Sequence, residues 1–223
     1  MKKDALGKNL KYERKNVWKE INDKEKKAIF DYAEEYKKFL DEGKTERESV
    51  ECAVKLAKKQ GYTEKISKEK DKLIFVNKGK AIALVYRGKK SITEGFRVVG
   101  AHVDSPRLDL KANPLYEDED LALLKTHYYG GIKKYHWLNR PLAIHGVVCL
   151  KGGKTVKISI GEDQNDPVFL ISDILPHLSY NVQNDKKITE AIPAEKLNII
   201  CGSIPVNLIC SSHFRIFVFT KMR

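Results

Sequence analysis

His102 and Asp104 are the residues of this 223-residue sequence whose types and spacing best suit metal chemistry. The run Val-Val-Gly-Ala, which carries no charged residue, leads into His102, and Pro106 follows Asp104 by two positions. A strand running through this segment would direct both side chains to one face, because side chains two apart on a strand share a face. An imidazole beside a carboxylate at the C-terminal end of a strand fits a metal ligand and the group that orients it. Taken alone, such a pair is more often an ordinary hydrogen-bonded histidine.

Two amphipathic helices are expected ahead of this segment. Each begins with a capping box of the form Asn/Thr-x-x-Glu and ends at a glycine. The boundary residues are Asn22, Glu25 and Gly43 for the first helix, and Thr45, Glu48 and Gly61 for the second. Apolar side chains recur at helical spacing at Ile29, Ala33, Tyr36 and Leu40, and then at Val50, Val54 and Ala57. We expect both apolar stripes to pack on a sheet.

Short apolar or alternating runs predict strands in the rest of the chain. The expected strands cover residues 73–76, 81–86, 96–102, 108–112, 125–129, 142–150 and 156–160. Turn residues at 77–80 and 151–154 predict hairpins. Residues 166–178 read as a further segment that ends in a turn or short helix carrying His177. Helices followed by a sheet indicate the beginning of an α/β layer, and the later strands indicate a separate β-rich module.

The net charge of +12 and the pI of about 9.4 raise the possibility of a nucleic-acid partner. Lysines alternate with acidic residues in the N-terminal third, as on solvated helix faces, and no arginine-rich tract occurs. A solvated basic surface is therefore the preferred interpretation, and a basic nucleic-acid binder stays an alternative.

The cysteines and the apolar runs indicate the cellular compartment of the protein. Cys52, Cys149, Cys201 and Cys210 are scattered and form no Cys-x-x-Cys pair, which is typical of reduced core cysteines. No run reaches the roughly 20 apolar residues of a membrane span, and the N-terminus lacks an apolar signal core. We expect a cytoplasmic protein with no membrane partner.

Residues 206–223 differ from the rest of the sequence. They contain no acidic residue, are dominated by apolar side chains, and show neither a period nor caps. A final buried strand and a non-native ending, such as a shifted reading frame, are both open interpretations.

Four short motifs, which follow one another in the family's order, resemble the M18 family of metalloaminopeptidases, the group of aspartyl aminopeptidase and aminopeptidase I. The motifs are Gly-Ala-His-Val-Asp-Ser-Pro-Arg-Leu at 100–108, Thr-His-Tyr-Tyr-Gly-Gly-Ile at 126–132, Pro-Leu-Ala-Ile-His-Gly at 141–146, and Ile-Ser-Asp-Ile-Leu-Pro-His-Leu at 171–178. The resemblance runs from about residue 17 to residue 205.

The resemblance implies a zinc-peptidase α/β domain that is interrupted by an inserted β-rich assembly domain, with both incomplete here. Residues 1–110 would be the N-terminal part of the catalytic domain, 111–205 part of the inserted oligomerisation domain, and 206–223 an atypical tail. The family site holds two metals, usually zinc. His102 matches its first metal-binding histidine, Asp104 the acidic residue that orients that histidine, and His177 a histidine that reaches a neighbouring subunit's site. Family members form homo-oligomers, commonly dodecamers.

The implied reaction is removal of one residue, often acidic, from a peptide's N-terminus. A metal-bound water attacks the carbonyl, a glutamate takes its proton, and a histidine stabilises the oxyanion. The family's remaining ligands include a Glu-Glu pair, and no Glu-Glu follows His102 here. Since zinc usually needs three or four protein ligands, we expect this chain alone to bind zinc poorly and to be inactive. A non-catalytic fragment or interaction module of the same ancestry is the alternative. With exposed sheet edges, the isolated chain is also expected to aggregate or to need a partner.

Overall fold

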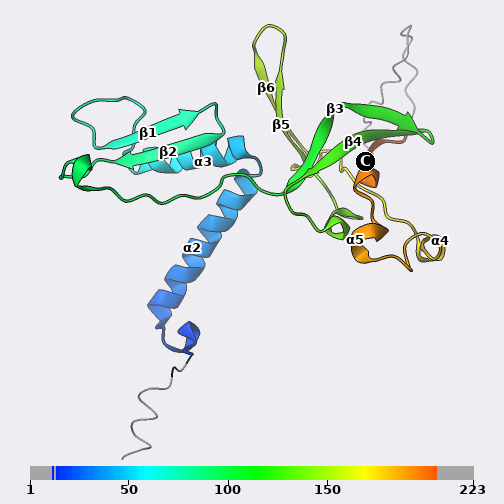
Figure 1. Ribbon diagram of the computed structural model, residues 1–223, viewed down its shortest axis with the longest axis horizontal. Coiled ribbons are helices and arrows are strands. Elements are labelled where there is room, and N and C mark those ends of the chain that lie inside the picture. The colour runs from blue at the N-terminus through cyan, green and yellow to red at the C-terminus, as the bar shows by residue number, and fades with distance from the viewer. Residues whose placement is uncertain (1–11, 13, 205–223) are drawn as a thin grey trace, which may run out of the picture.

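The structure is a computed structural model that describes residues 12 and 14–204. Two helices open the chain, α2 (Asp23–Glu42) and α3 (Glu46–Lys59). Both predicted capping boxes are present: the Asn22 side chain accepts from the Glu25 backbone N–H, and the Thr45 side chain does the same for Glu48. The predicted helix boundaries are therefore confirmed to within two residues. In Figure 1 the two helices lie at an angle to each other on one side of the molecule.

Helix α3 packs against a two-stranded antiparallel sheet of β1 (Lys72–Asn77) and β2 (Ala81–Tyr86). Val50 of α3 and Ile74 of β1 are both 2% exposed. Lys78 and Gly79 adopt positive φ angles of 51° and 67° in the turn, the backbone that a tight hairpin turn requires. The predicted hairpin is confirmed.

The expectation that both helices pack on a sheet holds only for α3. Helix α2 contacts α3 but has no buried residue, and Ile29, Tyr36 and Leu40 of its predicted stripe are exposed. Within the described residues, the apolar stripe of α2 therefore remains exposed.

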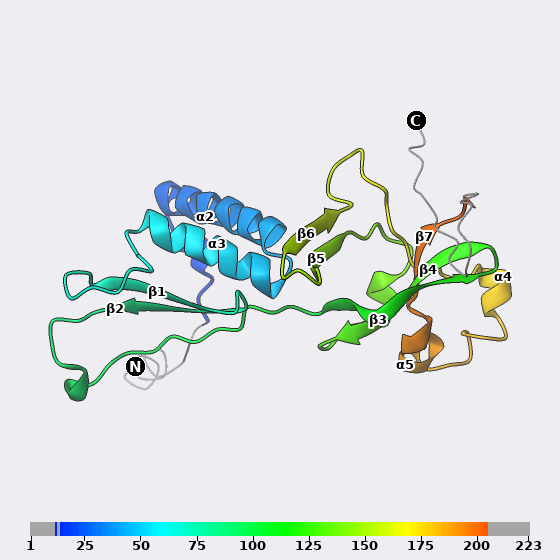
Figure 2. The same ribbon diagram turned by 90° about the horizontal axis from the view of Figure 1, so that it is seen from above.

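The second half of the chain is β-rich (Figure 2). A three-stranded sheet has the order β3 (Arg107–Asp118), β4 (Leu121–Tyr129) and β7 (Ile199–Gly202), with antiparallel pairing throughout. A separate hairpin joins β5 (Ile144–Cys149) to β6 (Thr155–Ile160). A hydrophobic core gathers on the three-stranded sheet and consists of Ala122, Phe169, Ile171, Leu197, Ile199 and Cys201.

The short helix η1 (Val17–Lys19) precedes α2. Further short helices lie between the strands: η2 (Ile92–Glu94), η3 (Lys134–Trp137), α4 (Pro176–Ser179), α5 (Ile188–Ala191) and η4 (Ala194–Lys196). The predicted short helix carrying His177 is confirmed as α4. Mixed helices and sheets of this kind agree with a partial α/β domain followed by a β-rich part.

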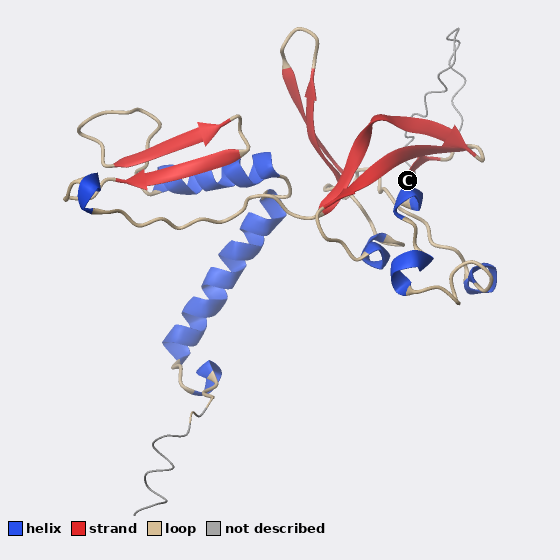
Figure 3. Cartoon of the chain, viewed as in Figure 1, coloured by secondary structure: helices blue, strands red, loops and turns tan. Residues whose placement is uncertain are grey.

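The predicted strand over 96–102 is wrong. Residues 96–106 are loop, drawn in tan between η2 and β3 in Figure 3. A strand exists only where a neighbour accepts and donates its backbone hydrogen bonds, and no strand in the described ranges pairs with this segment. Its apolar side chains are consequently exposed, and Val99 is 99% exposed.

The described residues also test the expectations for the cysteines and for membrane-spanning segments. Cys52 and Cys201 are free and buried, as predicted for core cysteines, whereas Cys149 is free and exposed. No helix among the described residues is long and apolar enough to span a membrane. The interpretations of the tail at 206–223, together with Cys210, lie outside the described residues.

Candidate metal-binding segment

His102 and Asp104 lie together although no strand carries them. His102 Nδ1 is 3.2 Å from Asp104 Oδ1 and 2.7 Å from the backbone oxygen of the same residue. When Nδ1 carries the proton, it donates to Asp104 and leaves the lone pair of Nε2 outward. The imidazole is 81% exposed, so Nε2 is accessible to a ligand. This is the arrangement expected of a metal-binding histidine and its orienting carboxylate.

Tyr129, the last residue of β4, holds the other oxygen of Asp104. Its phenol donates to Asp104 Oδ2 over 2.7 Å. This donated hydrogen bond is the main reason that the pKa of Asp104 lies below its usual value, and the pKa of Tyr129 is raised by the same contact. The carboxylate therefore stays ionised and is held between the imidazole and β4.

Arg107, the first residue of β3, extends this chain of contacts to α3. Its guanidinium lies 4.2 Å from the centre of the Tyr129 ring, a cation–π distance. The same guanidinium donates to Asp109 at 2.7 Å and to Glu46 of α3 at 3.2 Å. Because Arg107 is only 22% exposed, these contacts fix the start of β3 against the N-terminus of α3.

Tyr129, Arg107 and Glu46 were not predicted as site residues. Arg107 and Tyr129 both lie within the motifs that resemble the M18 family, but they are 22 residues apart in the sequence, and Glu46 lies 61 residues before Arg107. No feature of the sequence indicated their contact beyond the clustering of polar and aromatic residues in those motifs.

His177 lies at the second position of α4, on the exposed surface of the β-rich half. The structure brings together His102 and Asp104, and it gives no contact between His177 and that pair. Figure 1 shows α4 at the far end of the β-rich half from α3.

The comparisons with known proteins decide the family. Residues 39–206 match the model of the aminopeptidase I zinc metalloproteases, M18, which is about three quarters of the sequence. This chain belongs to the M18 family. The match includes His102, Asp104, Tyr129 and His177.

Comparisons with individual relatives support the same family. The chain is 49% identical over 206 residues to a probable M18 family aminopeptidase 1 of Clostridium acetobutylicum, an alignment that covers 89% of this chain and 44% of that relative. The crystal structure of an M18 aminopeptidase from Thermotoga maritima superposes with a TM-score of 0.80 at 44% identity, covering 88% of this chain and 43% of that one. Aminopeptidase I from Borrelia burgdorferi superposes with a TM-score of 0.73 at 39% identity, covering 88% and 45%. The chain therefore spans less than half the length of the relatives that it matches.

The described residues do not by themselves fit the zinc site that the M18 family name implies. Zinc needs three or four nitrogen, sulfur or oxygen donors at one point. No group of three or more His, Cys, Asp or Glu residues in the described ranges is arranged to hold a metal ion. The His102 pair offers one accessible nitrogen donor, fewer than the three or four that zinc needs.

Proposed function

We propose that this chain forms the N-terminal part of a metal-dependent M18 aminopeptidase that removes N-terminal residues, including acidic ones, from peptides. The observation that carries the proposal is the exposed His102 imidazole with Asp104 on its Nδ1 side, inside the family match. The relatives named above as aminopeptidases support the reaction class.

Three residues receive roles in this proposal. His102 is the first ligand of a two-zinc site, and Asp104 orients it. His177 serves the site of a neighbouring subunit, as the family resemblance implies, and its exposed side chain is accessible to another chain.

The proposal extends to organisation. Residues 1–110 contribute to the catalytic domain and 111–205 to an inserted oligomerisation domain, while the sequence of 206–223 is atypical of both. The working form is a cytoplasmic homo-oligomer, a dodecamer by family resemblance.

This chain alone is proposed to be inactive and to bind zinc weakly. The lack of a three-ligand group in the described part of the chain supports this, and it equally favours a second candidate, a non-catalytic module of M18 ancestry. The test is to purify the 223-residue chain, measure bound zinc after dialysis, and assay release of Asp, Glu and Leu from peptide substrates. Zinc-dependent release that disappears in His102→Ala would contradict the proposed inactivity. Absence of zinc and of release is the expected result. His136→Ala, at another exposed histidine, is the control for any activity that His102→Ala removes.

A further inference from the structure

His145, on β5, makes a second histidine cluster that is separate from the His102 segment. Its Nδ1 lies 2.8 Å from Glu48 Oε1 of α3, and its Nε2 lies 2.7 Å from Glu162 Oε1 in the loop after β6. The His145 side chain is 11% exposed, and its contact with Glu48 is partly buried, whereas its contact with Glu162 lies at the exposed surface. One imidazole ring thus connects the N-terminal helices to the β5–β6 hairpin.

Each ring nitrogen of His145 faces a carboxylate oxygen. A neutral imidazole has one N–H, whereas an imidazolium has two. Glu48 Oε2 already accepts from the backbone N–H and the hydroxyl of Thr45, at 3.0 and 2.9 Å, as expected of an ionised carboxylate. Glu162 pairs with Lys44 at 3.0 Å, and this contact, followed by that of His145, keeps the pKa of Glu162 below its usual value. With both carboxylates ionised, each ring nitrogen has to donate.

The charged groups around the His145 ring are two carboxylates and one ammonium. Glu48 faces the ring from α3, Glu162 faces it from the loop after β6, and Lys44 reaches Glu162 from the segment before α3. Ser159 is the neutral register partner of His145 on β6. When His145 is protonated, two carboxylates are matched by one imidazolium and one ammonium. Loss of the ring proton would leave one carboxylate facing an imidazole lone pair.

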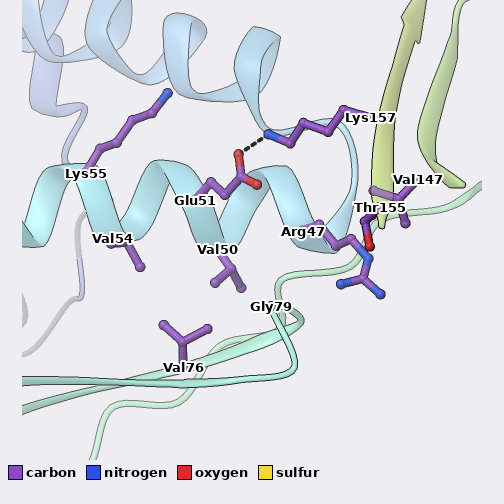
Figure 4. A pocket seen from close by; sticks show the side chains of 10 residues that line it. All are labelled: Arg47, Val50, Glu51, Val54, Lys55, Val76, Gly79, Val147, Thr155 and Lys157. Carbon is purple, nitrogen blue, oxygen red and sulfur yellow. Dashed lines mark hydrogen bonds and ion pairs between the residues drawn. The ribbon is translucent and has the colours of Figure 1, made fainter. Parts of the chain in front are cut away.

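The hairpin depends on such polar contacts because an open groove separates it from α3. The groove, of about 550 Å³, lies between α3, the β1–β2 turn and the β5–β6 hairpin (Figure 4). Val50 and Val54 line it from α3, and Val147 lines it from the hairpin. Across it, Lys157 of β6 pairs with Glu51 of α3, a second ionic contact between the same elements.

We propose that His145 is a protonation-dependent joint: as an imidazolium it bridges Glu48 and Glu162 and holds the β5–β6 hairpin on α3, and loss of its proton loosens that attachment. The inference rests on the geometry of this cluster and is independent of peptidase activity. A cation held by carboxylates stabilises the attached state at low pH and stops doing so as pH rises and the ring deprotonates.

The first test needs no variant. In the 223-residue chain with ¹⁵N-labelled histidine, NMR at about pH 6 should find both ring nitrogens of His145 protonated. As pH is raised to about 8.5, the methyl signals of Val147 should change with the same midpoint as the His145 ring signals. A His145 ring with a single N–H at about pH 6, or Val147 signals that ignore its titration, would overturn the proposal.

The second test measures attachment directly by amide hydrogen exchange of residues 144–160 at a fixed pD near 6. His145→Gln should speed exchange there about tenfold, since hydrogen bonds to charged groups contribute on that order. His136→Gln, in η3, is the matched control and should leave exchange unchanged. Equal exchange in wild type and His145→Gln would contradict the joint.

Discussion

Tyr129 donates a hydrogen bond of 2.7 Å to the carboxylate of Asp104, 25 residues earlier in the chain. The contact makes the loop that carries His102 depend on β4 of the β-rich half. It also links a segment with no strand partner in the described ranges to the three-stranded sheet.

Asp104→Asn should lower the pKa of Tyr129 toward its ordinary value. The pKa of this phenol is raised, first by its hydrogen bond to Asp104 and then by the negative charge of that carboxylate. The measurement is a titration between about pH 9 and 12 by NMR of tyrosine labelled with ¹³C at Cζ. Tyr116 is the internal control, because burial is the main cause of its raised pKa. If the titration of Tyr129 is the same in both proteins, the hydrogen bond does not form in solution.

Ile171→Ala should destabilise the β-rich half by about 2–5 kcal/mol. Ile171 is 1% exposed and belongs to the core that includes Phe169 and Leu197, so truncation leaves a cavity. The free energy of unfolding from urea denaturation is the measurement. Ile174→Ala, at an exposed position three residues later, is the matched control and should change it by less than about 0.5 kcal/mol.

Val99→Asp should reduce aggregation of the chain without lowering its stability. Val99 is 99% exposed in the loop before His102, beside exposed Val98 and Phe96. Such apolar clusters favour self-association, and a charge there disfavours it. Light scattering and dye binding to apolar surface report the change. The prediction fails if aggregation is unaltered, whereas Val50→Asp, in the core of the α3 contact, should unfold the protein.

Glu162→Gln should lower the stability of the protein near neutral pH. On acidification the variant should lose less stability than the wild type does. The pKa of Glu162 is depressed, chiefly by Lys44 and then by His145. A depressed carboxyl pKa gives stability that is full above the ordinary value of about 4.5 and is lost as pH falls through the folded value. Glu162 is 39% exposed, so the effect should be within about 1 kcal/mol.

Thermal unfolding between about pH 3 and 7 measures the effect of Glu162→Gln. Glu34→Gln, which removes the exposed pair with Lys37, is the control and should keep the acid dependence of the wild type. Identical pH dependence in wild type and Glu162→Gln would show that the ion pairs of this cluster do not stabilise the fold.

Much of the local structure was predictable because its causes are local. The capping boxes at Asn22 and Thr45, and the turn at Lys78 and Gly79, depend on residues within a few positions of each other. The alternating segments that became β3 and β6 are likewise encoded within single strands. The four sequence motifs also identified the M18 family correctly.

What the sequence could not provide depends on residues distant in the chain. The segment at 96–102 has strand-like composition, but strand formation needs a pairing partner, and it is loop in the described structure. The stripe on α2 has helical spacing, but spacing does not specify what covers it. The convergence of Glu46, Arg107 and Tyr129, and that of Glu48, His145 and Glu162, joins separate elements with no sequence signature.

The most direct test of the central claim is a chimera in which residues 17–204 replace the matching segment of the Clostridium acetobutylicum relative, 49% identical to this chain. Zinc content after dialysis and release of the N-terminal residue from peptides are measured together. The chimera should hold zinc and be active, His102→Ala should lose both, and Asp104→Asn should lower activity or metal affinity about 10–100-fold. His136→Ala should leave both unchanged. A folded chimera whose zinc content and activity survive His102→Ala would contradict the assignment of this chain to the aminopeptidase site.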